Sequence, residues 1–328
     1  MEIRAEIAQI RVYLHSSLST LHTFYFIVVR SKVILDLIIP TISQGLLWSV
    51  LAIGVYLTFR VLDVADLTVE GSFPLGAAVA ASLLVAGWSP IPAIFVACFA
   101  GMLSGVVTGI LTTKFKIPAL LSGILTMIAL YSVNLRVMGK ANLPLLRIDT
   151  LFTQFGWISE DPQMVVFAVG LFVVLLIGVL CYWFFGTEIG AAIRATGFNP
   201  NMIRANGVNT DVTIILGLLL SNGLVAVSGA LVAQSNGFAD VGMGVGTIVI
   251  GLASVIIGEV LFGTASFWRC LISVVLGSVV YRIVIAVVLQ MGMPPNDLKL
   301  FTAILVAAAL ALPLLQGKVK ERRRRAVD

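Results

Sequence analysis

Residues 186–211, "GTEIGAAIRATGFNPNMIRANGVNTD", form a polar stretch between two runs that contain no charged residue, 163–185 and 212–232. A hydrocarbon core of about 30 Å requires roughly 20 apolar residues for a helix to cross it. Each flanking run is long enough for this. The stretch is therefore expected to be a loop at a membrane surface that joins two transmembrane helices.

The same pattern extends along the whole chain. Its 328 residues are 59% hydrophobic and 11% charged, with a mean hydropathy of +1.07, whereas about a quarter of the residues of a typical soluble domain are charged. The composition predicts an all-α polytopic membrane protein without a second domain. The expected spans are 37–59, 73–87, 90–112, 119–138, 163–185, 212–232, 242–262, 267–290 and 299–317. Eight to ten spans remain open, because the short apolar runs can also be re-entrant segments.

The basic residues predict the orientation of the chain, because Lys and Arg near span ends are retained in the cytoplasm. The tail 318–328, "KVKERRRRAVD", carries six of them, which places the C-terminus in the cytoplasm. Counting back through the transmembrane domain, 37–317, puts 186–211 in the cytoplasm and 139–162 outside.

The N-terminal extension, 1–36, fits this scheme poorly. An odd number of spans places it outside, together with Arg4, Arg11, Arg30 and Lys32, against the charge rule. Three interpretations stay open: an amphipathic surface helix, a weak tenth span, or a translation start near Val33.

The residue types exclude several classes of function. Cys98, Cys181 and Cys270 each lie alone in or beside an apolar run, and both histidines are in the N-terminal extension. The chain has no metal-binding motif and no GxxxxGK phosphate loop. We therefore expect no catalytic residue, no metal or cofactor, and no nucleotide hydrolysis by this chain itself.

Two interruptions of the apolar pattern resemble each other. The stretches 64–82, "VADLTVEGSFPLGAAVAAS", and 238–256, "FADVGMGVGTIVIGLASVI", both pair Ala with Asp and continue into small residues. The predicted topology places them on opposite sides of the membrane, which is typical of an inverted repeat whose broken helices line a transport pathway. The alternative is two ordinary loops with chance similarity. The candidate pathway residues are Asp63, Asp66, Glu70, Gly71, Ser72, Phe73, Asp240, Gly242, Gly244 and Gly246.

Two arginines in or beside the apolar runs need partners, because charge at membrane depth is costly. Arg60 lies three residues before Asp63, so that a structural ion pair between them and a contact with the substrate are both open. Arg282 lies near the middle of its span and must face protein or a cavity; a carboxylate is its expected partner, and a contact with the substrate is the alternative. The central spans otherwise offer apolar and small side chains, which favours an amino acid over a phosphorylated substrate.

The stretch 186–211 predicts two short capped helices. Thr187 can cap a helix that starts at Glu188 and ends at Gly197. Asn199 can cap a second helix, with Pro200 in its first turn and Gly207 after its end. Met202 and Ile203 indicate a protein partner, whereas a zero net charge argues against nucleic acid or an anionic-lipid anchor. A folded loop without a partner is the alternative.

Three segments together resemble a known family. They are 42–81, "ISQGLLWSVLAIGVYLTFRVLDVADLTVEGSFPLGAAVAA", 190–211, "GAAIRATGFNPNMIRANGVNTD", and the Gly-rich run 241–258. They resemble the permease subunits of bacterial ATP-binding-cassette importers of the branched-chain amino-acid type, which include ribose and nucleoside permeases. "DLTVEGSFPLGA" is similar to a single-permease subgroup, some members of which are linked to aromatic amino acids.

The resemblance implies a multi-pass protein of the bacterial inner membrane that imports a small solute, with an amino acid expected and a sugar or nucleoside as alternatives. It implies a homodimer, two cytoplasmic ATPase subunits and an extracytoplasmic solute-binding protein. The pattern Gly190, Arg194, Asn199, Ala205, Gly207, Asn209 and Asp211 looks like the cytoplasmic coupling loop of that family. The candidate coupling residues are Glu188, Gly190, Arg194, Asn199, Pro200, Met202, Ile203, Arg204, Ala205 and Gly207. An ion-coupled secondary transporter remains the main alternative, and a membrane scaffold or enzyme subunit is the third.

Overall fold

The structure is a computed structural model that describes residues 37–292, 294, 297, 300–304 and 306–308. The chain divides into two units, Met1–Pro40 and Thr41–Asp328, and the second contains nearly all of the described residues. The N-terminal extension 1–36 and the basic tail 318–328 lie outside the described residues. The predicted span 299–317 is described only in part, where its residues are helical.

Within the described residues, seven helices are long and apolar enough to cross a membrane. They are Leu37–Val61, α3 (Pro90–Thr113), α4 (Ala119–Met138), α6 (Pro162–Gly186), α9 (Thr210–Asn236), Val241–Phe262 and α11 (Phe267–Gln290). Each corresponds to a predicted span. The predicted span 73–87 corresponds to a shorter apolar helix, α2 (Val69–Val85). The prediction of an all-α polytopic membrane protein is confirmed.

The first interruption explains why α2 is short. The Leu37–Val61 helix ends in a π-helical turn, η1 (Leu57–Val61), and the chain then runs without helical structure until α2 begins at Val69. Asp63 adopts a left-handed backbone conformation there, with φ of +54°. Non-helical backbone at membrane depth is tolerated where protein buries it. The sequence prediction started α2 four residues too late, because Thr68, Glu70 and Ser72 interrupt the apolar run.

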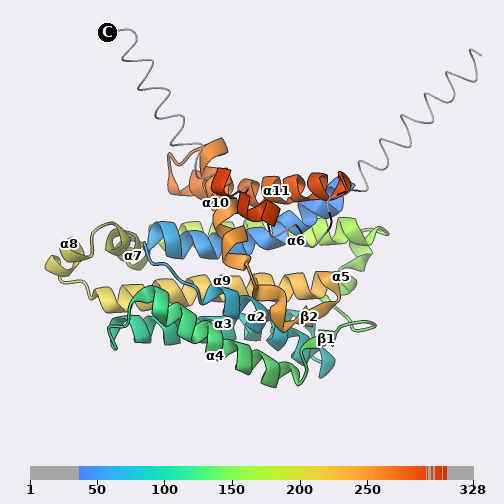
Figure 1. The fold of residues 1–328 in the computed structure, drawn as a ribbon, viewed down its shortest axis with the longest axis horizontal. Helices are drawn as coiled ribbons and strands as arrows, with labels where there is room; N and C mark the ends of the chain where they lie inside the picture. The colour runs from blue at the N-terminus through green and yellow to red at the C-terminus, as the bar shows by residue number, and fades with distance from the viewer. Residues whose placement is uncertain (1–36, 293, 295–296, 298–299, 305, 309–328) are drawn as a thin grey trace, which may run out of the picture. The chain divides into compact units, whose positions relative to one another are not determined.

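The second interruption follows α9. That helix ends at Asn236, and the next residue, Gly237, has a φ of +76°. β2 (Phe238–Asp240) and the short helix η3 (Val241–Gly244) then come before α10 (Thr247–Phe262). β2 pairs antiparallel with β1 (Asn142–Pro144), with Leu143 opposite Ala239. The sequence did not predict these two strands. The adjoining elements α5 (Leu151–Gln154) and η2 (Gly156–Ile158) lie at the same end of the bundle (Figure 1).

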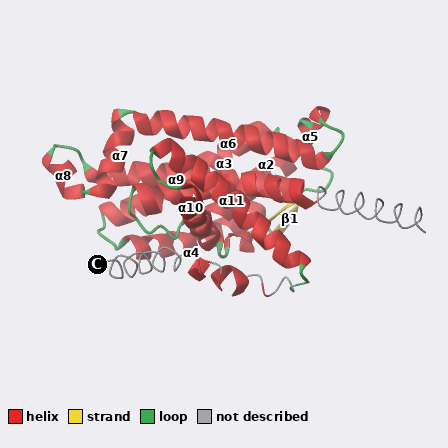
Figure 2. Ribbon diagram, turned by 90° about the horizontal axis from the view of Figure 1, so that it is seen from above, coloured by secondary structure: helices red, strands yellow, loops and turns green. Residues whose placement is uncertain are grey.

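The helices pack through small residues, as membrane helices commonly do. Figure 1 shows α11 on one side of the first helix and α2, α3, α4 and α9 on its other side, whereas α10 overlaps the first helix in this view. Figure 2 shows α6 along one edge of this bundle. A Cβ atom added at Gly76 of α2 would overlap the Ala226 backbone of α9, and one at Gly229 of α9 would overlap the Phe73 carbonyl. The backbones of α2 and α9 are therefore in direct contact.

We predict that Gly76→Ala destabilises the protein. Alanine normally favours a helix over glycine by about 1 kcal/mol, but overpacking a close backbone contact costs about 1–3 kcal/mol. The variant should therefore unfold at a lower temperature in detergent than the wild type. Gly178→Ala in α6 is the matched control, since an added Cβ there meets no atom within 4 Å. Equal or higher stability of Gly76→Ala would refute the close contact.

Candidate functional site

The first interruption is held by a buried carboxylate, Asp66. Its side chain is 0% exposed. Oδ1 accepts a hydrogen bond from the Thr68 backbone N–H at 2.9 Å, and Oδ2 accepts one from Asn222 Nδ2 of α9 at 2.7 Å. An ionised or polar group in an apolar interior is costly unless it is hydrogen-bonded. These bonds therefore fix the non-helical segment against α9.

The network continues from Asp66 into three neighbouring helices. Ser72 Oγ donates to Asn222 Oδ1 at 2.6 Å, so Asn222 bridges Asp66 and α2. The Thr68 and Thr108 hydroxyls lie 2.7 Å apart, and Thr108 donates to Thr126 at 2.9 Å, which extends the contact to α3 and α4. Asp66 and Ser72, both candidate pathway residues, thus lie in the packed interior of the described chain.

Gly71 and Phe73 are also enclosed. The Gly71 carbonyl accepts a hydrogen bond from Asn134 Nδ2 of α4 at 3.2 Å, and a Cβ at Gly71 would press on Leu130. Phe73 is fully buried and packs on Trp48, with ring centroids 5.0 Å apart. In this conformation both residues hold α2 in place rather than line an open space.

The two interruptions meet at the start of α2. The Gly246 backbone N–H, directly before α10, donates to Glu70 Oε1 at 3.0 Å. A Cβ at Gly244 would overlap the Glu70 carbonyl and press on Pro74. Glu70 thus lies in the first turn of α2 and accepts a hydrogen bond at the start of α10. The dipoles of both helices favour a negative charge at these N-terminal ends. The structure brings together Glu70, Gly71, Ser72, Gly244 and Gly246 from the candidate set.

Three other candidates lie apart from this junction. Asp63 is exposed. Asp240 caps η3 by accepting from the Gly242 N–H at 2.7 Å, and its Oδ2 accepts from Asn142 of β1 at 3.2 Å. Gly242 is exposed as well.

Among the described residues, the two arginines contact other side chains than the carboxylates considered from the sequence. Arg60 forms its ion pair with Glu259 of α10 and not with Asp63. Arg282 has no carboxylate partner among the described residues; its guanidinium carbon lies 4.1 Å from the centroid of the Trp48 ring. Both real partners are distant in sequence, and so local spacing could not identify them.

The stretch 186–211 folds as the predicted pair of capped helices, α7 (Glu188–Phe198) and α8 (Pro200–Ala205). The Gly190 N–H donates to Thr187 Oγ1 at 3.3 Å, and the Met202 N–H donates to Asn199 Oδ1 at 3.1 Å. Both predicted N-caps are confirmed. Gly207 follows α8 with φ of +84°, the left-handed conformation that favours glycine. We call α7 and α8 with their caps, 187–207, the hairpin.

Two details of the hairpin prediction were wrong. Gly197 does not end α7, which continues to Phe198. Gly197 is instead the point where α7 contacts the end of the first helix, because a Cβ there would overlap the Val61 carbonyl and press on Leu62. Ile203 is only 8% exposed, so it packs inside the chain and cannot fill a cleft in a partner.

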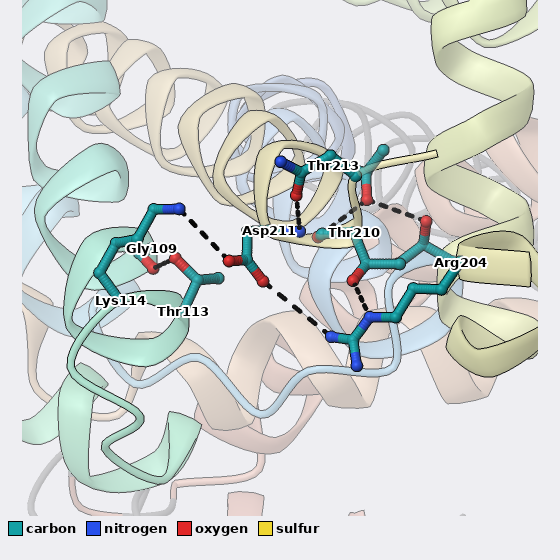
Figure 3. Close-up of polar contacts among 9 residues, drawn as sticks. Gly109, Thr113, Lys114, Arg204, Thr210, Asp211 and Thr213 are labelled. Atoms are coloured by element: carbon teal, nitrogen blue, oxygen red, sulfur yellow. Dashed lines mark hydrogen bonds and ion pairs between the residues drawn. The ribbon is translucent and has the colours of Figure 1, made fainter. Parts of the chain in front are cut away.

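Polar contacts attach the hairpin to the transmembrane helices (Figure 3). Arg204 Nε donates to Thr210 Oγ1 at 2.6 Å, and its guanidinium lies 4.0 Å from Asp211. Lys114, at the end of α3, reaches the same Asp211 at 3.3 Å. The Thr196 and Thr213 hydroxyls lie 2.9 Å apart. These exposed ion pairs contribute little stability each, but together the contacts connect α7, α8, α3 and α9.

The outer surface of the hairpin carries large apolar side chains. Phe198 is 90% exposed and Met202 is 49% exposed, and Ala205 one turn further along α8 is exposed as well. We call these three residues the hairpin face. Phe198 was not among the sequence candidates. It directly precedes the cap Asn199, a position from which a hydrophobic residue normally packs onto the new helix. Its exposure instead is visible only in the structure.

Of the other coupling candidates, Glu188, Arg194 and Pro200 are exposed, whereas Gly190 is buried. A Cβ at Gly190 would overlap the backbone of Phe184 and Phe185, so this glycine lets α7 fold tightly against the end of α6. Arg194 lies 5.7 Å from the centre of the Phe267 ring, at the start of α11. The described residues contain no group of three or more His, Cys, Asp or Glu that could hold a metal ion.

Comparisons with known proteins agree with this arrangement. The family model described as "Branched-chain amino acid transport system / permease component" matches residues 37–310. A "Tyrosine transport system permease protein" of Clostridioides difficile (strain R20291) is 42% identical over 87% of this chain and 94% of its own length. An uncharacterized protein of Rickettsia prowazekii (strain Madrid E) is 31% identical over 84% of this chain and 98% of its own.

A more distant relative has a different printed substrate. The "Galactofuranose transporter permease protein YtfT" of Escherichia coli (strain K12) is 25% identical over 69% of this chain and 64% of its own length. No solved structure matches the chain.

Proposed function

Because the chain belongs to the branched-chain amino acid transport system permease family and is the permease component of an ATP-binding-cassette transport system, we propose that it imports an amino acid, with aromatic amino acids as the preferred class. The solute arrives from an extracytoplasmic binding protein. Two copies of the chain form the pathway, and two ATPase subunits drive it from the cytoplasm.

The structure of the hairpin is the main support for an ATP-driven mechanism. It is short, capped at both helix starts and attached by polar contacts to α9, which the Lys114–Asp211 ion pair connects to the end of α3. A rigid-body displacement of the hairpin would therefore be passed directly to α9, which carries Asn222 of the buried network. The hairpin face presents apolar side chains at the surface, where an ATPase subunit would bury them.

The proposed orientation places the hairpin in the cytoplasm. Four exposed basic side chains lie in the hairpin or directly after α3. Their position agrees with the retention of Lys and Arg on the cytoplasmic side. They are Lys114, Lys116, Arg194 and Arg204. The strands β1 and β2 and helix α5 then face the binding protein. The C-terminus is placed in the cytoplasm by the same scheme.

The substrate class rests on the relative named for tyrosine, which covers 94% of its own length in the match. The relative named for galactofuranose is more distant, so we expect no uptake of this sugar and use it as the negative control substrate. A secondary transporter would use a single chain and an ion gradient, which family membership disfavours.

Uptake measurements test the proposal. Cells that express the permease, its ATPase and its binding protein should accumulate L-tyrosine, and accumulation should persist when an ionophore collapses the ion gradients while ATP is maintained. An ATPase variant that cannot hydrolyse ATP should abolish uptake. Uptake that survives loss of the ATPase but disappears with the ion gradient would make the chain a secondary transporter, and uptake of galactofuranose alone would overturn the amino-acid assignment.

A further inference from the structure

Arg282 is a cation inside a membrane-spanning helix without an anion to neutralise it among the described residues. It lies well within α11, between the ends Phe267 and Gln290. Its Nε atom is buried and has no hydrogen-bond partner, and none of the ion pairs of the described chain includes it. Charged side chains at such positions are costly and usually belong to a substrate or ion pathway.

The aromatic partner of Arg282 compensates only part of this cost. The guanidinium lies on the Trp48 ring, a cation–π contact at 4.1 Å. Trp48 in turn packs on the fully buried Phe73. The ring neutralises no charge and accepts no hydrogen bond from the edge of the guanidinium. Arg282 and Trp48 are both partly exposed in the described chain.

The three side chains connect the first helix, α2 and α11. Phe73 lies one helical turn after Glu70, the residue at which the two interruptions meet. A guanidinium fixed on an aromatic ring presents several N–H donors in a planar fork, and a carboxylate matches this geometry with two parallel hydrogen bonds. A neutral sugar offers no such group.

We propose that Arg282, oriented by Trp48 and Phe73, binds the carboxylate of the transported amino acid. The inference rests on the proposed function and names the part of the substrate that is recognised. The carboxylate of the substrate neutralises Arg282 only during transport. Its binding is therefore weak enough for the amino acid to be released.

The test compares L-tyrosine with tyramine, which lacks the carboxylate. Both probes are titrated against the purified full-length permease in lipid nanodiscs, and binding is read from the tryptophan fluorescence change that a Trp48→Phe variant lacks. L-tyrosine should bind at least about tenfold more tightly than tyramine, since hydrogen bonds between a guanidinium and a carboxylate are stronger than those between neutral groups.

The decisive variant is Arg282→Gln, in which the preference for L-tyrosine over tyramine should fall to near one while tyramine binding is unchanged. Arg282→Lys should keep part of the preference. Arg136→Gln, at the exposed end of α4, is the control and should keep all of it. Equal affinity of the wild type for both probes, no change in Trp48 emission with either, or equal loss of both probes in Arg282→Gln would overturn the inference.

Uptake by the same variants separates this inference from the proposed function. If the wild-type complex takes up no amino acid, the proposed function fails. If the wild type takes up L-tyrosine and Arg282→Gln does so with the same preference for the carboxylate, only the assignment of Arg282 fails.

Discussion

Phe198→Asp should abolish ATP-driven uptake and release the ATPase from the permease. Phe198 is 90% exposed, so its replacement leaves the fold of the chain intact. A buried aromatic anchor of an interface commonly contributes 2 kcal/mol or more, which corresponds to a loss of affinity of about thirtyfold or greater. We expect the variant to insert normally, to lose copurification with the ATPase and to show no substrate-stimulated hydrolysis. Ala205→Glu, which adds bulk and charge to the same face, should act in the same direction.

The matched control for Phe198 lies at the other end of the bundle. Trp157 is 80% exposed beside α5, and both views place α5 opposite α7 and α8 (Figures 1 and 2). Trp157→Asp should leave ATPase association unchanged. If Phe198→Asp and Trp157→Asp both retain the ATPase and transport at the wild-type rate, the hairpin is a partnerless loop.

Asp66→Ala should cause the largest loss of stability within the transmembrane domain. The substitution leaves Asn222 Nδ2 and the Thr68 N–H without their acceptor in a fully buried site. Removal of one partner of a buried polar contact costs about 1–3 kcal/mol per group, and more where the partner is charged. We expect a clear decrease in thermal stability in detergent and loss of transport.

An exchange of the two side chains separates this bond from general disruption. Asn222→Asp alone should be severely destabilising because it places two carboxylates together. In the double variant Asp66→Asn with Asn222→Asp, the new amide can donate to the new carboxylate, which still accepts from Ser72. Recovery is incomplete, because Asn222 Nδ2 also donates to the Leu218 carbonyl. If the double variant loses at least as much stability as the two single variants lose together, the Asp66–Asn222 bond is not the relevant contact.

The sequence predicted the features that depend on neighbouring residues. Span length and composition predicted the long helices, and the caps Thr187 and Asn199 were confirmed because N-capping is set within three residues of the helix start. The two interruptions were recognised from their charged and Gly-rich segments. All of these signals are local.

The missed features depend on residues far apart in the chain. Asp66 is bonded to a residue 156 positions away, and Arg60 to one 199 positions away. Glycine is common at helix ends, which is why Gly197 was expected to end α7. Its close contact with Val61 instead explains why a glycine is needed there. Ile203 and Phe198 are both apolar residues of one short hairpin, and only the packing shows that the first is buried and the second exposed.

The most direct measurement of the central claim is site-specific cross-linking of the assembled complex. A photoreactive amino acid is placed at position 198, 202 or 205 of the hairpin face, and at position 157 as the control, in permease expressed with its ATPase and binding protein. We expect covalent adducts with the ATPase from the three hairpin positions and none from position 157, with yields that change between nucleotide-free and ATP-bound states. Adducts with the binding protein from the hairpin, or with the ATPase from position 157, would contradict the orientation and the coupling role assigned to 187–207.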